Sequence, residues 1–192
     1  MSEIIRCYWC LGADIMKDYH DNEWGNPLHD DTKHFEFFIL DAFQAGLSWL
    51  TILKKRENFR KAFDNFDLQK VANYNESDFE RLMQDVGIVR NRLKINATIN
   101  NAEKFLTMQS KFGSFDNYIW QFTDGKPVVN AHKTIKEVPP KTALSDKISK
   151  DLLFYGFKFV GSTICYAYMQ AAGIVNDHLT SCYRYKEIID KY

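Results

Sequence analysis

The chain has no net charge, few cysteines and no hydrophobic run long enough to cross a membrane. Lysine and arginine total 25, and aspartate and glutamate also total 25. This balance argues against a strongly basic nucleic-acid binder and limits any nucleic-acid contact to a local patch. Four cysteines in 192 residues are too few for a disulfide framework. Because the N-terminus also lacks a signal-peptide pattern, we expect a reduced, soluble, cytoplasmic protein.

Alternating strand patterns are also missing, whereas helical periodicity runs through most of the chain. Hydrophobic residues make up 45% of the chain, which predicts a globular protein with a substantial core. Residues 123–140 are the least regular segment, and the fold is expected to be all-α. The expected helices are one capped by Asp30 or Asp31 that stops near Gly46, one capped by Ser48, one with a Ser77–Glu80 capping box that ends at Gly87, one from Val89 to about Met108, one from Ser114 to Phe122, one from Ser145 to about Tyr155, and one that ends at Gly173.

Sulfur and imidazole side chains lie in pairs near the two ends of the chain. Cys7 and His20 are close to the start, and His178 and Cys182 near the end have the spacing His-x3-Cys. On a helix, that spacing places both side chains on one face. Structural zinc sites use four nitrogen and sulfur ligands in a closed tetrahedral shell. The four residues therefore suggest one metal site that ties the two termini together.

Other cysteine and histidine residues leave alternatives open. Cys10 forms a Cys-x2-Cys pair with Cys7, which fits either a ligand pair or a redox motif. A redox motif of that kind needs a βαβ context, and none is visible. His29, His34 and His132 have no partner at ligand spacing, so we interpret them as surface or internally satisfied histidines.

A short turn bounded by Gly156 and Gly161 joins the last two expected helices. Such a turn is typical of a helix-hairpin-helix, in which backbone amides and the second helix N-terminus approach a phosphate. Lys158 adds a positive charge within the turn. The same pattern also fits a glycine turn that serves packing alone.

A tight corner is expected between two helices at residues 44–49, with the sequence QAGLSW. An exposed Leu47 beside Gly46 would act as a wedge between bases, whereas a buried packing cluster is the alternative. Basic residues follow this corner and open the next long helix, where they form either solvated faces or phosphate contacts. They are Lys54, Lys55, Arg56, Arg60, Lys61, Arg90, Arg92 and Lys94.

Asp41 is the only charged residue in the apolar run from Phe37 to Phe43. A carboxyl group in apolar surroundings has a raised pKa unless a partner donates hydrogen bonds to it. The NH groups of a ligand, or a cationic ligand, would be natural partners. A solvent-facing position on an amphipathic helix is the alternative interpretation.

Five segments resemble the DNA-3-methyladenine glycosylase I family, and they occur in the family's order. They are YHDNEWG (19–25), QAGLSW (44–49), KRE (55–57), GFKFVG (156–161) and VNDH (175–178). The resemblance runs from about Cys7 to Cys182. It implies a helix-hairpin-helix DNA glycosylase fold over residues 1–192, as a single unit whose helical lobes share one cleft. It also implies one structural zinc per chain, with the ligands Cys7, His20, His178 and Cys182.

The resemblance further implies which residues form the site. The family's aromatic base pocket corresponds to Trp9, Tyr19 and Trp49. Its purine-reading carboxylate is a glutamate, whereas this chain has Asp41, which is shorter by one bond of about 1.5 Å. Asp41 and Tyr19 are the implied catalytic residues, and a pocket tyrosine common in relatives corresponds to Met16. The implied DNA contacts are Gly46, Leu47, Gly156, Lys158 and Gly161.

The expected activity is excision of 3-methyladenine from alkylated double-stranded DNA. Methylation at N3 makes the base cationic and a good leaving group, so binding and orientation matter more than acid catalysis. Asp41 and the indole faces would favour that cation over neutral adenine. Asn176 takes the position near which many helix-hairpin-helix glycosylases carry a catalytic aspartate. We therefore expect a monofunctional enzyme that uses water and leaves an abasic site.

The expected partners are alkylated DNA and the free 3-methyladenine product, without a membrane, and the protein is expected to be a monomer. An alternative hypothesis follows from Asp41 replacing the family glutamate. The chain would then be a damage-binding protein of the same fold with weak or lost turnover.

Overall fold

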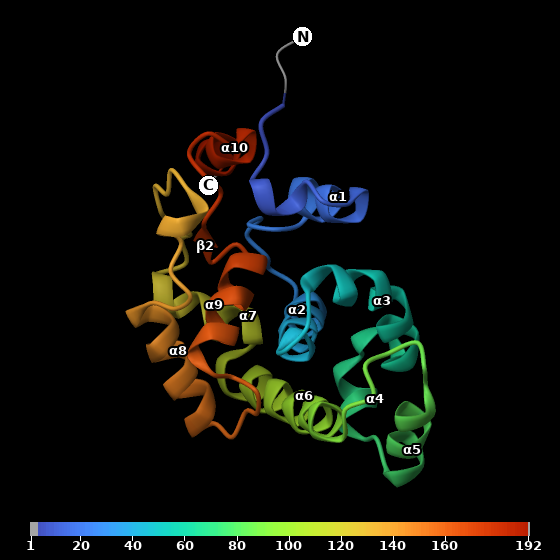
Figure 1. Cartoon of the computed structure of the whole chain (residues 1–192). Coiled ribbons are helices and arrows are strands. Elements are labelled where there is room, and N and C mark those ends of the chain that lie inside the picture. Colours follow the sequence, from blue (N-terminus) through green and yellow to red (C-terminus); the bar gives the residue numbers. More distant parts are fainter. Residues whose placement is uncertain (1–3, 192) are drawn as a thin grey trace.

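Helices account for nearly all of the regular structure in residues 4–191, the range that this computed structural model describes (Figure 1). Residues 1–3 and 192 of the expected 1–192 unit lie outside this range. No helix within it is both long and apolar enough to cross a bilayer. The helices are α1 (Asp14–Asn22), α2 (Asp31–Gln44), α3 (Trp49–Ala62), α4 (Leu68–Ala72), α5 (Glu76–Gln84), α6 (Arg92–Phe112), α7 (Phe115–Trp120), α8 (Ala143–Phe154), α9 (Ser162–Ala171) and α10 (Tyr183–Lys191).

Two helices begin at the capping residues that the sequence predicts. The Asp30 side chain accepts a hydrogen bond from the Lys33 amide at the start of α2. The Ser48 side chain does the same for the Thr51 amide at the start of α3. Each bond satisfies an amide that has no partner within its own helix. The Ser48 cap lies at the predicted corner between α2 and α3 and helps to fix where α3 begins.

Two other predicted helix starts are wrong by a few residues. The α5 helix is capped by Asn75, whose side chain accepts hydrogen bonds from the Ser77 and Asp78 amides. In turn, the Asp78 carboxylate accepts a hydrogen bond from the Asn75 amide. An earlier residue thus forms the capping box that we assigned to Ser77. The α8 helix is capped by Thr142, and Ser145 is the reciprocal partner in that box. In both segments several capping residues lie within one turn, so local pattern alone does not select among them.

Helix α2 lies at the centre of the molecule, against α3, α6, α7 and α9 (Figure 1). Every residue from His34 to Phe43 is buried, so this helix is apolar on nearly all sides and takes a core position. The Phe38 ring illustrates the packing, because it contacts Phe105, Phe157 and Tyr168 from three other segments. As a consequence, Asp41, near the C-terminal end of α2, is carried into the interior.

A short parallel strand pair adds to the helical fold. Strand β1 (Val128–Val129) pairs with β2 (Val175–Asn176), with Val128 opposite Val175. The pair holds the irregular segment at 123–140 against the chain that follows α9. The sequence did not predict these strands, because each is only two residues long and shows no alternation. The expectation of a mainly helical fold is confirmed.

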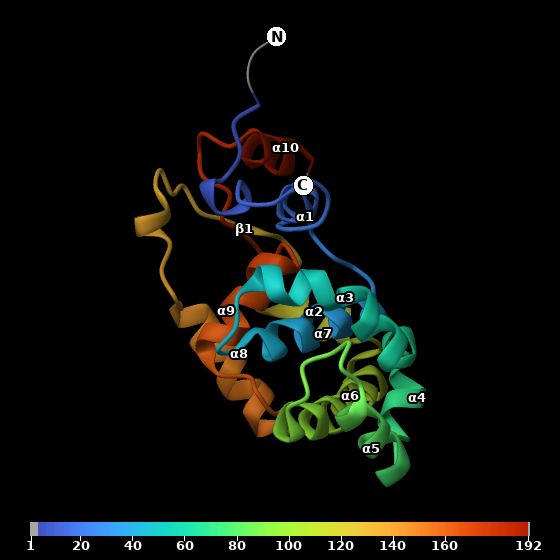
Figure 2. The same ribbon diagram turned by 45° about the vertical axis from the view of Figure 1, so that its right-hand side comes forward.

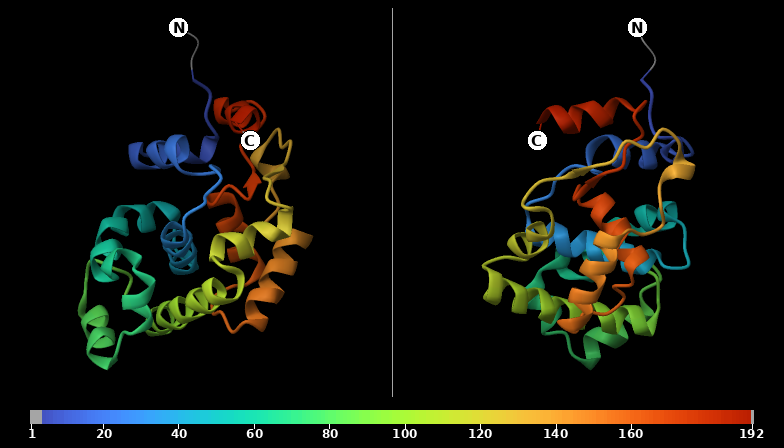
Figure 3. Two further views of the ribbon diagram at one scale, coloured as in Figure 1. Left: turned by 180° about the vertical axis from the view of Figure 1, so that it is seen from behind. Right: turned by 90° about the vertical axis from the view of Figure 1, so that its left-hand side faces the viewer.

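The two ends of the chain meet on one side of the molecule, where α10 lies near α1 (Figures 2 and 3). The Tyr183 amide donates to the Ile5 carbonyl at 3.0 Å. Arg6 forms an ion pair with Asp21 at 2.8 Å, and its guanidinium lies over the Tyr183 ring. Polar and aromatic contacts thus hold together segments that are 177 and 178 residues apart in sequence, from Arg6 and Ile5 to Tyr183.

Part of the basic cluster after the corner has a structural role. Arg56 is buried and donates to both oxygens of Glu23 and to Glu36. Arg60 also donates to Glu36, at 2.7 Å. Lys55 is bonded to two backbone carbonyls of the loop before α6. Neither of the two alternatives for the basic residues, a solvated face or a phosphate contact, holds for Arg56, since its guanidinium is buried among carboxylates.

We predict that Glu36→Ala destabilises the protein by about 3 kcal/mol, because it leaves the Arg56 charge partly uncompensated in the interior. Urea unfolding followed by circular dichroism measures the change. Glu57→Ala is the matched control, since Glu57 is exposed and pairs with Arg60 at the surface; its effect should stay within about 0.5 kcal/mol. Equal effects of the two substitutions would contradict this assignment.

Candidate functional site

A cavity of about 330 Å³ lies between the N-terminal segment, α2, α9 and the irregular segment. It brings together the four residues that we expected to line one pocket, which are Trp9, Tyr19, Asp41 and Trp49. We call it the aromatic cavity. Its other lining side chains include Trp24, Gln44, Ile135, Val138, Pro139, Pro140, Thr163, Tyr166, Ala167, Gln170, Asp177 and Leu179.

Aromatic rings form one wall of this cavity. The Tyr19 ring centroid lies 5.2 Å from that of Trp49 and 6.4 Å from that of Trp9. Trp24, which sequence reasoning did not single out for the site, adds a fourth ring 5.0 Å from Trp9. Indole and phenol faces carry negative potential and provide flat apolar surfaces. The wall therefore suits a planar ligand, and a cationic one in particular.

Asp41 is buried in this cavity with one oxygen unpaired. Its side chain comes from α2, and the residue is 5% exposed. Among residues 4–191, nothing forms a hydrogen bond with Asp41 Oδ2. Burial raises the pKa of this carboxyl group well above its usual value. The alternative of a solvent-facing Asp41 is therefore wrong.

A second unpaired polar atom lines the same cavity. Trp49 Nε1 is buried and has no acceptor in the described part of the chain. A buried donor or acceptor without a partner is destabilising, and such atoms are rare in folded proteins. An unpaired acceptor on Asp41 and an unpaired donor on Trp49 therefore indicate a ligand with complementary groups.

Asp177 is a cavity residue that sequence reasoning missed. It is 2% exposed, and its carboxylate accepts hydrogen bonds from Asn130, Tyr166 and Gln170 at 2.6–2.7 Å. These bonds join the irregular segment to α9. Its neighbours in sequence, Asn176 and His178, are both polar, so no local pattern marked Asp177 as a cavity residue.

Asn176, beside Asp177, has a structural environment. It is fully buried, its amide donates to the Tyr185 carbonyl, and its oxygen accepts from the His178 amide. Met16, at the position of the expected pocket tyrosine, is half-buried and packs against the hydrophobic core.

The corner between α2 and α3 presents an exposed leucine. Gly46 has a φ of +83°, a conformation that favours glycine, and Leu47 is 42% exposed. Lys94 supports the corner from α6, because its ammonium group donates to the carbonyls of Phe43 and Ala45 at 2.8 and 2.7 Å. The alternative of a fully buried packing cluster is wrong for Leu47.

The turn between α8 and α9 uses several of its amides internally. The Gly156 amide donates to Leu153, and the Lys158 amide donates to the Asn101 side chain at 2.8 Å. Gly156 has a φ of +84°, whereas Gly161 is the N-cap of α9 with an ordinary φ of −57°. An anion at this turn would therefore meet the amides at the start of α9 rather than those of Gly156 and Lys158.

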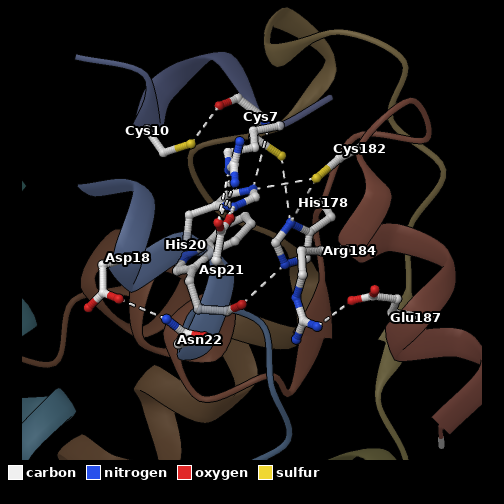
Figure 4. Close-up of polar contacts among 12 residues, drawn as sticks. Cys7, Cys10, Asp18, His20, Asp21, Asn22, His178, Cys182, Arg184 and Glu187 are labelled. Carbon is white, nitrogen blue, oxygen red and sulfur yellow. Dashed lines mark hydrogen bonds and ion pairs between the residues drawn. The ribbon is translucent and has the colours of Figure 1, made fainter. Parts of the chain in front are cut away.

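The four predicted metal ligands converge on one point (Figure 4). All are buried, and their ligand atoms lie within 4.8 Å of one another. His178 Nδ1 lies 3.6 Å from Cys7 Sγ and 3.7 Å from Cys182 Sγ, and His20 Nε2 lies 3.4 Å from Cys182 Sγ. In a tetrahedral zinc shell, nitrogen and sulfur ligands are about 3.6 Å apart. The donor set therefore fits zinc.

His178 and Cys182 do not lie on a helix, the geometry in which we interpreted their spacing. Both residues lie in the short connection between β2 and α10, which is not helical. A turn brings them together instead, since the Cys182 amide donates to the Leu179 carbonyl at 2.7 Å. The Leu179 amide in turn points at Cys7 Sγ at 3.4 Å. The spacing was informative, although its structural explanation was different.

The surroundings of His20, His178 and Cys182 favour the ligand forms. His20 Nδ1 bonds to Asp21 at 2.8 Å, and His178 Nε2 donates to the Trp24 carbonyl at 3.1 Å. In each ring the lone pair of the other nitrogen is then able to bind a metal. The hydrogen bond with Cys7, and then the two imidazoles, lower the pKa of the Cys182 thiol, whereas the same bond and burial raise the pKa of the Cys7 thiol. Burial lowers the pKa of His178, which keeps that ring neutral.

Cys10 is not part of this cluster, which answers the question left open by the Cys-x2-Cys pair. Its thiol donates to the Cys7 carbonyl at 3.1 Å, and burial raises its pKa to about 11. His34 is buried and bonded to Tyr168 and Asp116, so its interpretation as a satisfied histidine is confirmed.

Comparison with known proteins agrees with this geometry. The model of a family described as methyladenine glycosylase matches residues 9–185. The chain belongs to the methyladenine glycosylase family. It is 50% identical to DNA-3-methyladenine glycosylase 1 of Escherichia coli (strain K12), over 92% of this chain and 95% of the relative. It is 45% identical to the DNA-3-methyladenine glycosylase of Haemophilus influenzae, over 92% and 96%.

Solved structures of this family share the fold. A crystal structure of 3-methyladenine DNA glycosylase I has 47% identity, covers 93% of this chain and 98% of its own, and gives a TM-score of 0.90. A variant of 3-methyladenine DNA glycosylase I, in complex with 3-methyladenine, has 35% identity, coverage of 93% and 96%, and also a TM-score of 0.90. The methyladenine glycosylase fold is therefore shown over nearly the whole chain.

We predict that Asp41→Asn stabilises the protein at neutral pH, by roughly 1–3 kcal/mol. The folded-state pKa of Asp41 is raised, so the wild type loses stability as the pH rises through that value, whereas an amide does not ionise. Urea unfolding at about pH 5 and about pH 8 should show the advantage of the variant growing with pH. A variant less stable than the wild type at both pH values would contradict the unpaired state of Asp41.

Proposed function

We propose that this chain is a DNA repair glycosylase that excises 3-methyladenine from alkylated double-stranded DNA and leaves an abasic site. The observation that carries this proposal is the unpaired, buried carboxylate of Asp41 in a cavity walled by Trp9, Tyr19 and Trp49. Relatives with 45–50% identity are named for this activity, and a structural relative holds 3-methyladenine. We further propose that residues 1–192 act as one unit, as a cytoplasmic monomer.

Charge explains how such a site distinguishes damaged from normal bases. A 3-methyladenine base in DNA is cationic, and it would supply the positive charge and NH groups that the Asp41 carboxylate lacks. Its approach would lower the pKa of Asp41 and make the carboxylate anionic in the complex. The ring faces of Trp9 and Trp49 would add cation–π attraction, and the Tyr19 hydroxyl would bind the base edge. Neutral adenine gains much less from the same groups.

The chemistry then needs little acid catalysis. The bond between C1′ and N9 breaks, and its electron pair passes to the cationic base, which leaves as neutral 3-methyladenine. Water adds to the deoxyribose cation at C1′ and releases one proton to the solvent. The enzyme's task is to hold the extruded nucleotide in place for this step. We therefore propose a monofunctional glycosylase without lyase activity.

DNA would lie across the corner and the α8–α9 turn. Leu47, exposed beside Gly46, would fill the gap that the extruded nucleotide leaves. The free amides at the start of α9, after Gly161, and the ammonium group of Lys158 would contact the phosphates, and Gly156 shapes the turn.

We also propose one structural zinc per chain, held by Cys7, His20, His178 and Cys182. The support is the donor geometry described above, with two sulfurs and two imidazole nitrogens at tetrahedral spacing. Four protein ligands close the shell, so the ion when bound would contribute to folding rather than to the reaction.

We predict that the wild type releases 3-methyladenine from methylated DNA, and that Asp41→Asn lowers kcat/KM about a hundredfold. The reason is the loss of a charged hydrogen bond to a cationic base. Chromatography of the released base measures both. Asp14→Asn is the control, since Asp14 is an exposed acid outside the cavity. No release above background at micromolar enzyme would overturn the proposal.

The damage-binding alternative rests on the shorter side chain of Asp41. It would hold if the wild type showed no release and Asp41→Glu gave an easily measured rate. A wild type whose activity is abolished by Asp41→Asn excludes it.

We predict that Cys182→Ser reduces bound zinc from about one per chain to near zero. It should lower the free energy of unfolding by more than about 2 kcal/mol, because metal binding contributes directly to folding. Metal analysis and urea unfolding measure the two effects. Cys10→Ser is the matched control and should keep its zinc, since Cys10 lies outside the cluster. Equal zinc content in the two variants would refute the assigned ligand set.

A further inference from the structure

The metal cluster and the aromatic cavity share one tryptophan. The Trp24 ring stacks on His20, with ring centroids 6.3 Å apart and planes 17° apart. It also meets the His178 ring edge-on, with centroids 4.6 Å apart. In addition, the Trp24 carbonyl accepts the hydrogen bond from His178 Nε2. Two of the four metal-binding side chains therefore pack directly on Trp24.

The same indole borders the aromatic cavity. Trp24 lines it beside Trp9, and the two ring centroids lie 5.0 Å apart with planes at 71°. Trp9 in turn packs edge-on against His20, at 5.4 Å. Trp9 comes from the short 3-10 turn at Tyr8–Cys10, where regular structure contributes little to its orientation. Its position therefore depends on these ring contacts.

The backbone at Gly25, next to Trp24, packs closely against the His178 ring. Gly25 has a φ of +77°, and a Cβ atom there would lie 2.9 Å from His178 Nε2. The imidazole thus packs against the main chain itself. A shift of His178 would be transmitted to Trp24 through both the ring contact and the carbonyl bond.

We propose that Trp24 is a positioning residue that couples the metal centre to the aromatic cavity. Metal binding fixes the rings of His20 and His178, those rings hold the Trp24 indole, and the indole sets the angle of Trp9 toward the base. This inference rests on the proposed function and adds to it, because the metal then shapes the base-binding wall as well as joining the termini.

The first experiment measures binding of free 3-methyladenine to zinc-loaded Trp24→Leu by titration calorimetry. The expected result is an unchanged zinc content and a Kd raised roughly tenfold, which is the upper range for losing an aromatic pair. Trp120→Leu is the matched control, because Trp120 is buried against His29 and outside the cavity. The control should lose stability but keep the wild-type Kd. A wild-type Kd in zinc-loaded Trp24→Leu overturns the coupling.

The second experiment needs no variant and therefore does not depend on how Trp24→Leu folds. Cobalt(II) replaces zinc in the wild type, and its visible ligand-field absorption reports the geometry of the site. Addition of free 3-methyladenine should shift this absorption with the same Kd that calorimetry gives. Base binding without any spectral change overturns the coupling alone. A wild type that binds no base and releases none from DNA overturns the proposed function, and the coupling with it.

Discussion

A carboxylate held inside the protein without a partner is the constraint on which the rest of the site depends. Helix α2 is buried on nearly every side, so Asp41 cannot turn to solvent. The folded chain carries this destabilising group because the surrounding helices supply enough apolar burial to offset it. As a result, a positively charged group in the cavity would be stabilised by the Asp41 carboxylate. Under the proposed function, selectivity for a cationic base would follow from this unpaired carboxylate more than from shape.

The walls around Asp41 come from segments that are distant in sequence. Trp9 and Tyr19 belong to the first twenty residues, Trp49 to the start of α3, and Asp177 to the chain after α9. No single helix could present all of these groups to one planar ligand. The Cys and His cluster holds the first and last of these segments together, and Cys7 from this cluster also lines the cavity.

Features set by neighbouring residues were predictable from the sequence. The caps at Asp30 and Ser48 are examples, because their hydrogen bonds reach only three residues ahead. Start sites with several candidate caps were not predictable, as the choice of Asn75 over Ser77 shows. Family resemblance supplied the ligand set and the aromatic pocket, whose members meet only through tertiary contacts.

Other features depended on contacts that no local pattern contains. The burial of Asp41 was undetermined, because a helix that is apolar on all sides shows no solvent face. Asp177 and Trp24 were missed for a related reason. The first is placed by pairing of β1 with β2, and the second by rings from both ends of the chain. Arg56 was misread because its carboxylate partners lie 20 and 33 residues away.

The two-residue strand β2 has a consequence for how this family can change its length. The three side chains after Val175 lie in three different environments. Asn176 bonds to the backbone of α10, Asp177 lines the aromatic cavity, and His178 belongs to the Cys and His cluster. Since neighbouring side chains of an extended segment point in opposite directions, a slip by one position would exchange these environments. A single inserted or deleted residue here would disturb both the lining of the aromatic cavity and the Cys and His cluster. Length variation should therefore be tolerated in the irregular segment before β1 and rejected between β2 and Cys182.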